Sequence, residues 1–208
     1  MFDIVIIGAG INGSGIARDA SGRGLKVCLL DKNRVGEATS SWSTKLIHGG
    51  LRYLENYDFK LVRDSLIERE NIKKIANPIT QDMPFIIPYN KTMRPAWLIS
   101  LGLFIYDNIG GKTSLEKSKK IKIHDIYPNI LKKKYEYGFK YHDLTVDDKK
   151  LTKINAINAQ KLGAKVHEKT EITKTVRKKD HWLIYLKDQS IIKTKVLNFN
   201  LLQQDHTY

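Results

Sequence analysis

The 208-residue sequence contains a single cysteine and no long apolar run. One cysteine, Cys28, excludes a disulfide within the chain, which is typical of a protein in the reducing cytoplasm. No apolar run is long enough to span a bilayer, and no basic segment precedes the apolar start of the chain. Neither a membrane-spanning helix nor a secretion signal is therefore expected. The six histidines are scattered without metal-ligand spacing, which predicts no metal site.

Acidic residues are also scarce: the sequence has 22 Asp and Glu against 36 Lys and Arg, which gives a net charge of +14. A basic excess of this size can indicate a nucleic-acid partner or an anionic membrane surface. Lysine, isoleucine and asparagine are common throughout, and the basic residues do not alternate with aromatics on one stripe. This favours solvated faces and no nucleic acid. Weak attraction to anionic lipid is left open, and with it a peripheral position on the cytoplasmic membrane face.

The start of the chain carries the strongest local pattern. Residues 2–7 form a short apolar run, typical of a buried parallel strand, and the turn Gly8-x-Gly10-x-x-Gly13 follows at once. In a dinucleotide-binding turn these glycines allow a tight turn, the approach of a pyrophosphate to the backbone, and close packing of helix on strand. The following helix would direct its N–H groups and the positive end of its dipole toward the phosphates.

A second strand, residues 26–30, ends in Asp31, which lies 18 residues after Gly13. That offset is near the one expected for a carboxylate that accepts hydrogen bonds from ribose hydroxyls. Since strand, turn, helix, strand and acid all agree, a nucleotide site is favoured over a βαβ unit that binds no ligand.

Hydrophobic patterning predicts further helices and short strands along the chain. Helices are expected at residues 59–76, 96–108 and 148–162, and strands at residues 83–88, 138–143, 164–168, 172–176, 182–186 and 191–196. Residues 112–135 are expected to form a lysine-rich, mobile connection. The helix at residues 96–108 is apolar nearly all round, which favours a buried helix; contact with a membrane surface or a partner is the alternative.

The stretch around Gly49-Gly50 also carries a chemical signal. A glycine pair allows the backbone to approach a flat ligand closely. An ordinary loop would also be rich in Ser, Thr and Gly, but it would not usually carry Lys45, His48 and Arg52 so close to such a pair.

These stretches resemble the FAD-dependent, quinone-linked glycerol-3-phosphate dehydrogenases. The segments that carry the resemblance are residues 6–17, 22–25, 38–55, 94–97, 102–107 and 141–148. The block from Lys45 to Leu54 is far more specific than the glycine turn, and the similarity runs from about residue 2 to residue 198.

The resemblance implies an α/β fold: a Rossmann-like FAD-binding domain of the glutathione-reductase/D-amino-acid-oxidase type, truncated, with part of a second, α+β substrate domain. The expected divisions are an FAD-binding βαβ core at residues 1–75, a partial substrate or cap domain at 76–145, a return to the FAD-binding domain at 146–198, and an unmatched tail at 199–208.

The resemblance also implies a chemistry, in which a hydride passes from the secondary carbinol of glycerol 3-phosphate to the flavin, giving dihydroxyacetone phosphate, and electrons pass on to membrane quinone. The FAD-binding positions carried over are Gly8, Gly10, Ile11, Asn12 and Gly13 at the pyrophosphate, Asp31 at the adenosine ribose, and Thr39, Ser40, Lys45, Leu46 and Gly49 along the pyrophosphate, ribityl chain and flavin ring. Arg52 matches the arginine that faces the substrate's anionic group, because a guanidinium binds two oxygens in a fixed fork and keeps its charge.

Members of that family are more than twice this long, and the similarity stops at Asn198, just before an unrelated tail such as a frameshift would give. The chain is therefore expected to be an N-terminal portion that is inactive alone. A second, C-terminal polypeptide that completes it and supplies the general base is left open. The alternatives are an FAD-binding remnant without turnover and, in another class, a basic module that binds a membrane or nucleic-acid surface.

Overall fold

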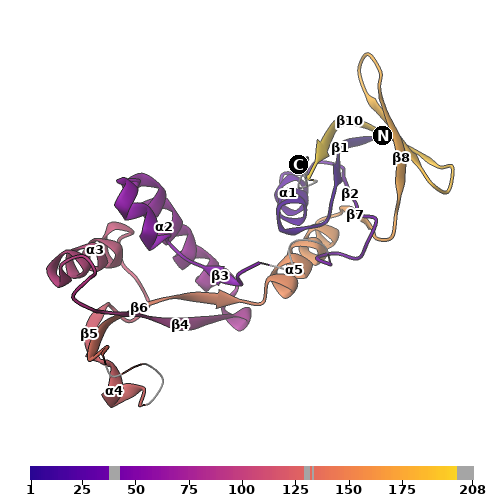
Figure 1. The fold of residues 1–208 in the computed structure, drawn as a ribbon. Coiled ribbons are helices and arrows are strands. Elements are labelled where there is room, and N and C mark those ends of the chain that lie inside the picture. The colour runs from indigo at the N-terminus through magenta and orange to yellow at the C-terminus, as the bar shows by residue number, and fades with distance from the viewer. Residues whose placement is uncertain (38–42, 129–131, 133, 201–208) are drawn as a thin grey trace, which may run out of the picture. The chain divides into compact units, whose positions relative to one another are not determined.

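The computed structural model describes residues 1–37, 43–128, 132 and 134–200. The chain divides into two compact units, the first from Met1–Thr44 and Asp147–Tyr208, the second from Lys45–Val146 (Figure 1). The sequence placed the first division at residue 75. The compact units divide at Thr44 because α2 (Phe59–Ile75) packs through Leu66 against Tyr106 of α3 (Ala96–Ile109), both in the second unit.

The first unit is built on a six-stranded sheet in the order β7-β2-β1-β10-β9-β8. Its strands are β1 (Phe2–Ile7), β2 (Val27–Leu30), β7 (Lys165–His167), β8 (Ile172–Arg177), β9 (Trp182–Leu186) and β10 (Ile191–Phe199). β7, β2, β1 and β10 run parallel, whereas β8, β9 and β10 form an antiparallel meander. The helices α1 (Ile11–Gly22) and α5 (Asp148–Lys161) lie side by side against this sheet (Figure 1).

Both faces of β1 and β2 are covered, as the continuous apolar runs predicted. Ile6 and Leu29 pack against the helices through small residues such as Ala17, which let α1 and α5 approach the sheet closely. On the opposite face Val5 and Cys28 pack with residues of the meander. Burial raises the pKa of the Cys28 thiol to about 12, so this cysteine is a core side chain rather than a reactive group.

The second unit is a four-stranded antiparallel sheet with helices packed on it. Its strands are β3 (Leu46–Ile47), β4 (Thr80–Pro88), β5 (Lys119–Lys122) and β6 (Tyr137–Val146), and β6 pairs with each of the other three. Its helices are α2, α3, the short α4 (Ile123–Ile126) and the 3₁₀ turns η2 (Leu51–Asn56) and η3 (Asn77–Ile79). Val62, Leu66 and Tyr106 form its buried helical core.

Two expectations about the second unit are wrong. Residues 112–135 contain β5 and α4 rather than a mobile connection throughout, because Ile121 and Ile123 are buried while the lysines beside them face solvent. The helix α3 is not buried: Trp97 is 67% exposed and Phe104 is 64% exposed, and of its residues only Leu103 and Tyr106 are buried. The helices that the structure describes include none long and apolar enough to cross a membrane.

Candidate functional site

The glycine turn between β1 and α1 is shaped by close backbone contacts. Gly8 has φ +103°, a conformation that favours glycine, and its N–H donates to the Leu30 carbonyl at 2.8 Å. A Cβ on Gly13 would lie 1.9 Å from the Gly8 carbonyl oxygen, so only glycine lets the first turn of α1 close on the strand. No side chain caps α1 at Gly10.

Asp31 is held at the same turn. One carboxylate oxygen accepts a hydrogen bond from the Ala9 N–H at 2.6 Å, and the other accepts one from the Asn33 N–H at 2.7 Å. Each carboxylate oxygen has a second lone-pair direction, so both can still accept a hydrogen bond from a ribose hydroxyl. The structure therefore brings together the turn and the acid that sequence spacing had linked.

These features fit a dinucleotide. The start of α1, next to a glycine that exposes backbone, directs the positive end of the helix dipole toward the place of a pyrophosphate. The fixed Asp31 carboxylate offers acceptors to a ribose. Ile11 and Asn12 lie in the first turn of α1, where the sequence had placed them.

Of the second group of predicted site residues, Lys45, Leu46 and Gly49 lie in the second unit. The Lys45 carbonyl accepts hydrogen bonds from the Val146 N–H at 2.8 Å and the Thr145 hydroxyl at 3.0 Å, and Leu46 pairs with Thr145 at the start of β3. This anchors the segment to β6. Thr39 and Ser40 lie outside the described residues.

Gly49, Gly50 and Arg52 follow directly after β3. Gly49 is buried, and Gly50 has φ +69°, which turns the chain into η2. Arg52 lies in the first turn of η2 with its side chain exposed, and it makes no ion pair within the described part of the chain. An exposed guanidinium without a protein partner is available to an anion.

Beneath the Gly49–Gly50 turn lies a polar cluster that sequence reasoning missed. The Gly49 N–H donates to the Tyr106 hydroxyl at 2.7 Å, and Tyr106 donates to both Asp143 oxygens at 2.9 and 3.0 Å. Arg69 donates to Asp143 at 2.7 Å. Burial raises the pKa of the Asp143 carboxyl, against the hydrogen bonds from Arg69 and Tyr106 that lower it. Burial also raises the pKa of Tyr106. The available signal was weak, because the strand around Asp143 also carries Lys140 and His142.

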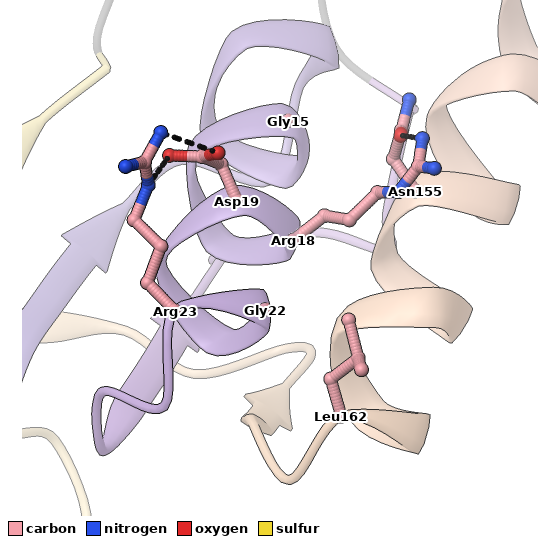
Figure 2. A pocket seen from close by; sticks show the side chains of 7 residues that line it. All are labelled: Gly15, Arg18, Asp19, Gly22, Arg23, Asn155 and Leu162. Carbon is pink, nitrogen blue, oxygen red and sulfur yellow. Dashed lines mark hydrogen bonds and ion pairs between the residues drawn. The ribbon is translucent and has the colours of Figure 1, made fainter.

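A separate groove of about 540 Å³ runs between α1 and α5 (Figure 2). Its two arginines are already engaged, since Arg18 donates to Asn155 at 3.1 Å and Arg23 pairs with Asp19 at 2.8 Å. None of the site residues predicted from the sequence lines this groove, so it is not part of the candidate site.

Comparison with known proteins gives a consistent result. The family described as FAD dependent oxidoreductase matches residues 3–198. The D-erythritol 1-phosphate dehydrogenase of Brucella abortus is 42% identical over 194 residues, which cover 93% of this chain and 39% of that protein. The glycerol-3-phosphate dehydrogenase of Pseudomonas aeruginosa is 44% identical over 186 residues, 89% of this chain and 36% of that protein. The chain thus spans less than two fifths of the length of these relatives.

Among solved structures, the glycerol-3-phosphate dehydrogenase from Bacillus halodurans complexed with FAD aligns with a TM-score of 0.64 at 21% identity, over 95% of this chain and 34% of that chain. Together with the family match, this confirms the Rossmann-like FAD-binding fold and FAD as the expected cofactor.

Proposed function

The chain belongs to the family of FAD dependent oxidoreductases, and from that premise we propose that it forms the cofactor-binding part, and a portion of the substrate-binding part, of a dehydrogenase that oxidises glycerol 3-phosphate to dihydroxyacetone phosphate. The observation that carries the proposal is the Asp31 carboxylate, which accepts a hydrogen bond from the Ala9 N–H at 2.6 Å beside the start of α1. A carboxylate and a helix N-terminus so arranged suit the ribose and the pyrophosphate of a dinucleotide.

The proposed FAD contacts are the positions that the resemblance carries over. In the first unit the proposed contacts are Gly8, Gly10, Ile11, Asn12 and Gly13 at the pyrophosphate and Asp31 at the ribose. Along the rest of the cofactor they are Thr39, Ser40, Lys45, Leu46 and Gly49. When bound, the flavin supplies a hydride acceptor.

Arg52 is the proposed partner of the substrate phosphate. Its side chain is exposed and without an ion pair among the described residues. A planar fork of donors matches two phosphate oxygens at once, which orients the substrate as well as binding it.

A second substrate is favoured by the relative from Brucella abortus, whose name specifies D-erythritol 1-phosphate. Glycerol 3-phosphate and D-erythritol 1-phosphate both join a phosphate to a chain of carbinols, so Arg52 would serve either. Relative affinity for the two compounds decides between them, and we take glycerol 3-phosphate as the first candidate because the stretches that carry the resemblance favour it.

Electrons would leave the flavin for membrane quinone, and the exposed face of α3 supports a peripheral membrane contact. Trp97, Leu101 and Phe104 recur at the spacing of one helical face, and all three are exposed. The exposed basic residues Lys91 and Arg94 precede the helix, where they would meet anionic headgroups.

Turnover is proposed to need more than these 208 residues. The edge of β10 that pairs with β9 up to Thr194 pairs with no strand beyond that residue, among the described residues. Val196 and Phe199, in this unpaired part, are about half exposed. Such an edge can accept a further strand, which suits a complementing polypeptide that also carries the general base. Without that complement the chain would bind FAD as an inactive remnant.

Titration of the purified chain with FAD and with NAD tests the proposed cofactor. Saturable FAD binding, seen as a shift of the flavin absorbance bands, is expected, with at least tenfold weaker binding of NAD. Tight NAD binding without affinity for FAD would contradict the proposal. A salt-sensitive nucleic-acid complex in a chain that binds no flavin would instead favour a basic surface-binding module.

A further inference from the structure

A buried ion pair lies under the Gly49–Gly50 turn and has no part in the function proposed so far. Arg69 is 4% exposed and Asp143 is 3% exposed, and the Tyr106 side chain between Asp143 and the turn is 2% exposed. Apolar side chains of similar volume often stabilise a core as well as a buried ion pair does. The pair is therefore expected to hold a neighbouring polar group in a position that apolar packing would not fix.

Asp143 decides which way the Tyr106 hydroxyl points. A carboxylate only accepts hydrogen bonds, so the Tyr106 proton must be directed to Asp143, 2.9 and 3.0 Å away. The lone pairs of the hydroxyl then face the Gly49 N–H at 2.7 Å. Tyr106 thus becomes a fixed acceptor for one backbone donor.

Arg69 keeps Asp143 in place from the other side. One of its terminal nitrogens donates to Asp143 at 2.7 Å, and the other donates to Glu70 at 3.1 Å and to the Thr113 hydroxyl at 3.0 Å. The guanidinium therefore ties α2, β6 and the segment after α3 into one anchor behind the tyrosine.

Fixing Gly49 fixes the start of η2. A Cβ on Gly49 would lie 2.4 Å from the Leu66 side chain, so the backbone is pressed against α2. The next residue, Gly50, has φ +69° and donates its N–H to His48 Nδ1 at 2.9 Å. The Gly50 carbonyl then accepts from the Tyr53 N–H at 2.8 Å, which begins the helical turn that carries Arg52.

We propose that Tyr106, with its hydroxyl oriented by Asp143, is a positioning residue that fixes the Gly49–Gly50 turn and, through it, the placement of Arg52. The positioning of the turn stands on the geometry alone. Its consequence for phosphate binding rests on the function proposed above for Arg52.

Tyr106→Phe tests the positioning, with Tyr141→Phe as the matched control. The two rings pack edge to face with centroids 6.1 Å apart, and both substitutions remove one hydroxyl from this pair. Only Tyr106 contacts Gly49. Amide hydrogen exchange, measured by NMR on the 208-residue chain, is expected to speed up about tenfold at Gly49 in Tyr106→Phe and to stay unchanged in Tyr141→Phe. Amides in the pairing of β4 with β6 serve as internal references.

A calorimetric titration with glycerol 3-phosphate supplies the functional readout. Binding is expected to weaken several-fold in Tyr106→Phe and not in Tyr141→Phe. Unchanged exchange at Gly49, or an equal increase in both variants, overturns the positioning role. Faster exchange with unchanged affinity overturns the link to Arg52. If the unsubstituted chain itself does not bind glycerol 3-phosphate, the substrate contact proposed for Arg52 fails in this chain, while the exchange measurement still decides the positioning role.

Discussion

Gly8 and Gly13 are glycines for reasons internal to the chain, whereas the backbone angles of Gly10 do not by themselves require glycine. Gly8 has φ +103°, and a Cβ on Gly13 would strike the Gly8 carbonyl oxygen. Gly10 has φ −74° and ψ −173°, an extended conformation that any residue adopts. The backbone conformation therefore does not explain why position 10 is glycine. Close approach by a ligand would explain it.

At Arg52 the account predicts a loss of substrate affinity without a loss of cofactor. Arg52→Ala is expected to weaken binding of glycerol 3-phosphate by about 1.5–3 kcal/mol, roughly 10- to 150-fold, because a charge-assisted contact to the phosphate is removed. Arg52→Lys should recover part of this, since it keeps the charge but not the fork. Calorimetry measures the affinity of each protein for FAD and for glycerol 3-phosphate. Equal affinity for glycerol 3-phosphate in the unsubstituted chain, Arg52→Ala and Arg52→Lys would show that Arg52 does not contact the substrate.

At Glu116 the account predicts a dependence of stability on pH. The hydrogen bonds from Lys119 and Lys140 lower the pKa of Glu116 to about 2. A carboxyl with a depressed pKa in the folded state stabilises it above the ordinary pKa, and that contribution is lost as the pH falls toward 2. Glu116→Gln should therefore narrow the difference in urea midpoint between pH 6 and pH 3. The carboxyl is exposed, so 1 M salt should reduce the effect; a variant with the same pH dependence as the unsubstituted chain would show that these contacts do not act in solution.

The residue pairs also show how far sequence reasoning reaches. Asp31 was tied to the glycine turn by a known offset, and the structure places it there. No sequence pattern linked Tyr106 and Asp143 to the site, because the contacts among Gly49, Arg69, Tyr106 and Asp143 join residues 37 to 74 positions apart in the sequence. Their relation depends on how α2, α3 and β6 pack, which no local pattern encodes.

Among the elements, those with a strong period were predicted and those without one were missed. β1, α1, β2 and α5 lie where apolar runs, glycines and caps placed them, and the Asp147 side chain accepts a hydrogen bond from the Lys150 N–H at 2.9 Å as an N-cap. β5 was missed because it is a strand through its pairing with β6, and its own sequence shows no apolar alternation. The exposure of α3 was missed because hydrophobicity alone does not identify what covers a helix.

The exposed face of α3 leads to a prediction about lipid. Trp97→Ser and Phe104→Ser should each weaken binding to vesicles containing phosphatidylglycerol several-fold, because each removes an apolar side chain that would enter the interface. Ile75→Ser, at the end of α2, is the control, since Ile75 is equally exposed at 68% but lies outside α3. Cosedimentation measures the binding; equal effects of all three substitutions would mean that α3 is not the contact.

At the scale of the whole molecule, the chain has the fold of FAD-dependent oxidoreductases but spans only 36–39% of the length of the relatives compared. We expect the purified 208 residues, supplied with FAD and detergent, to give no steady glycerol 3-phosphate-dependent reduction of an artificial electron acceptor, because the base that takes the carbinol proton is proposed to lie on a complementing polypeptide. Steady reduction that Arg52→Ala abolishes would establish the chain as a working enzyme by itself.

The central claim, that the turn after β1 holds FAD, is tested most directly by measuring FAD affinity in Gly10→Ala and Gly15→Ala. Both substitutions add one methyl group to the same turn and helix. A Cβ on Gly15 meets nothing within 4 Å, so Gly15→Ala should bind FAD like the unsubstituted chain. Gly10→Ala should bind FAD at least tenfold more weakly, because the methyl group would stand where the pyrophosphate approaches the backbone. The urea midpoints of both variants, measured alongside, separate lost FAD binding from lost stability. Equal FAD affinity in the two variants would contradict the account.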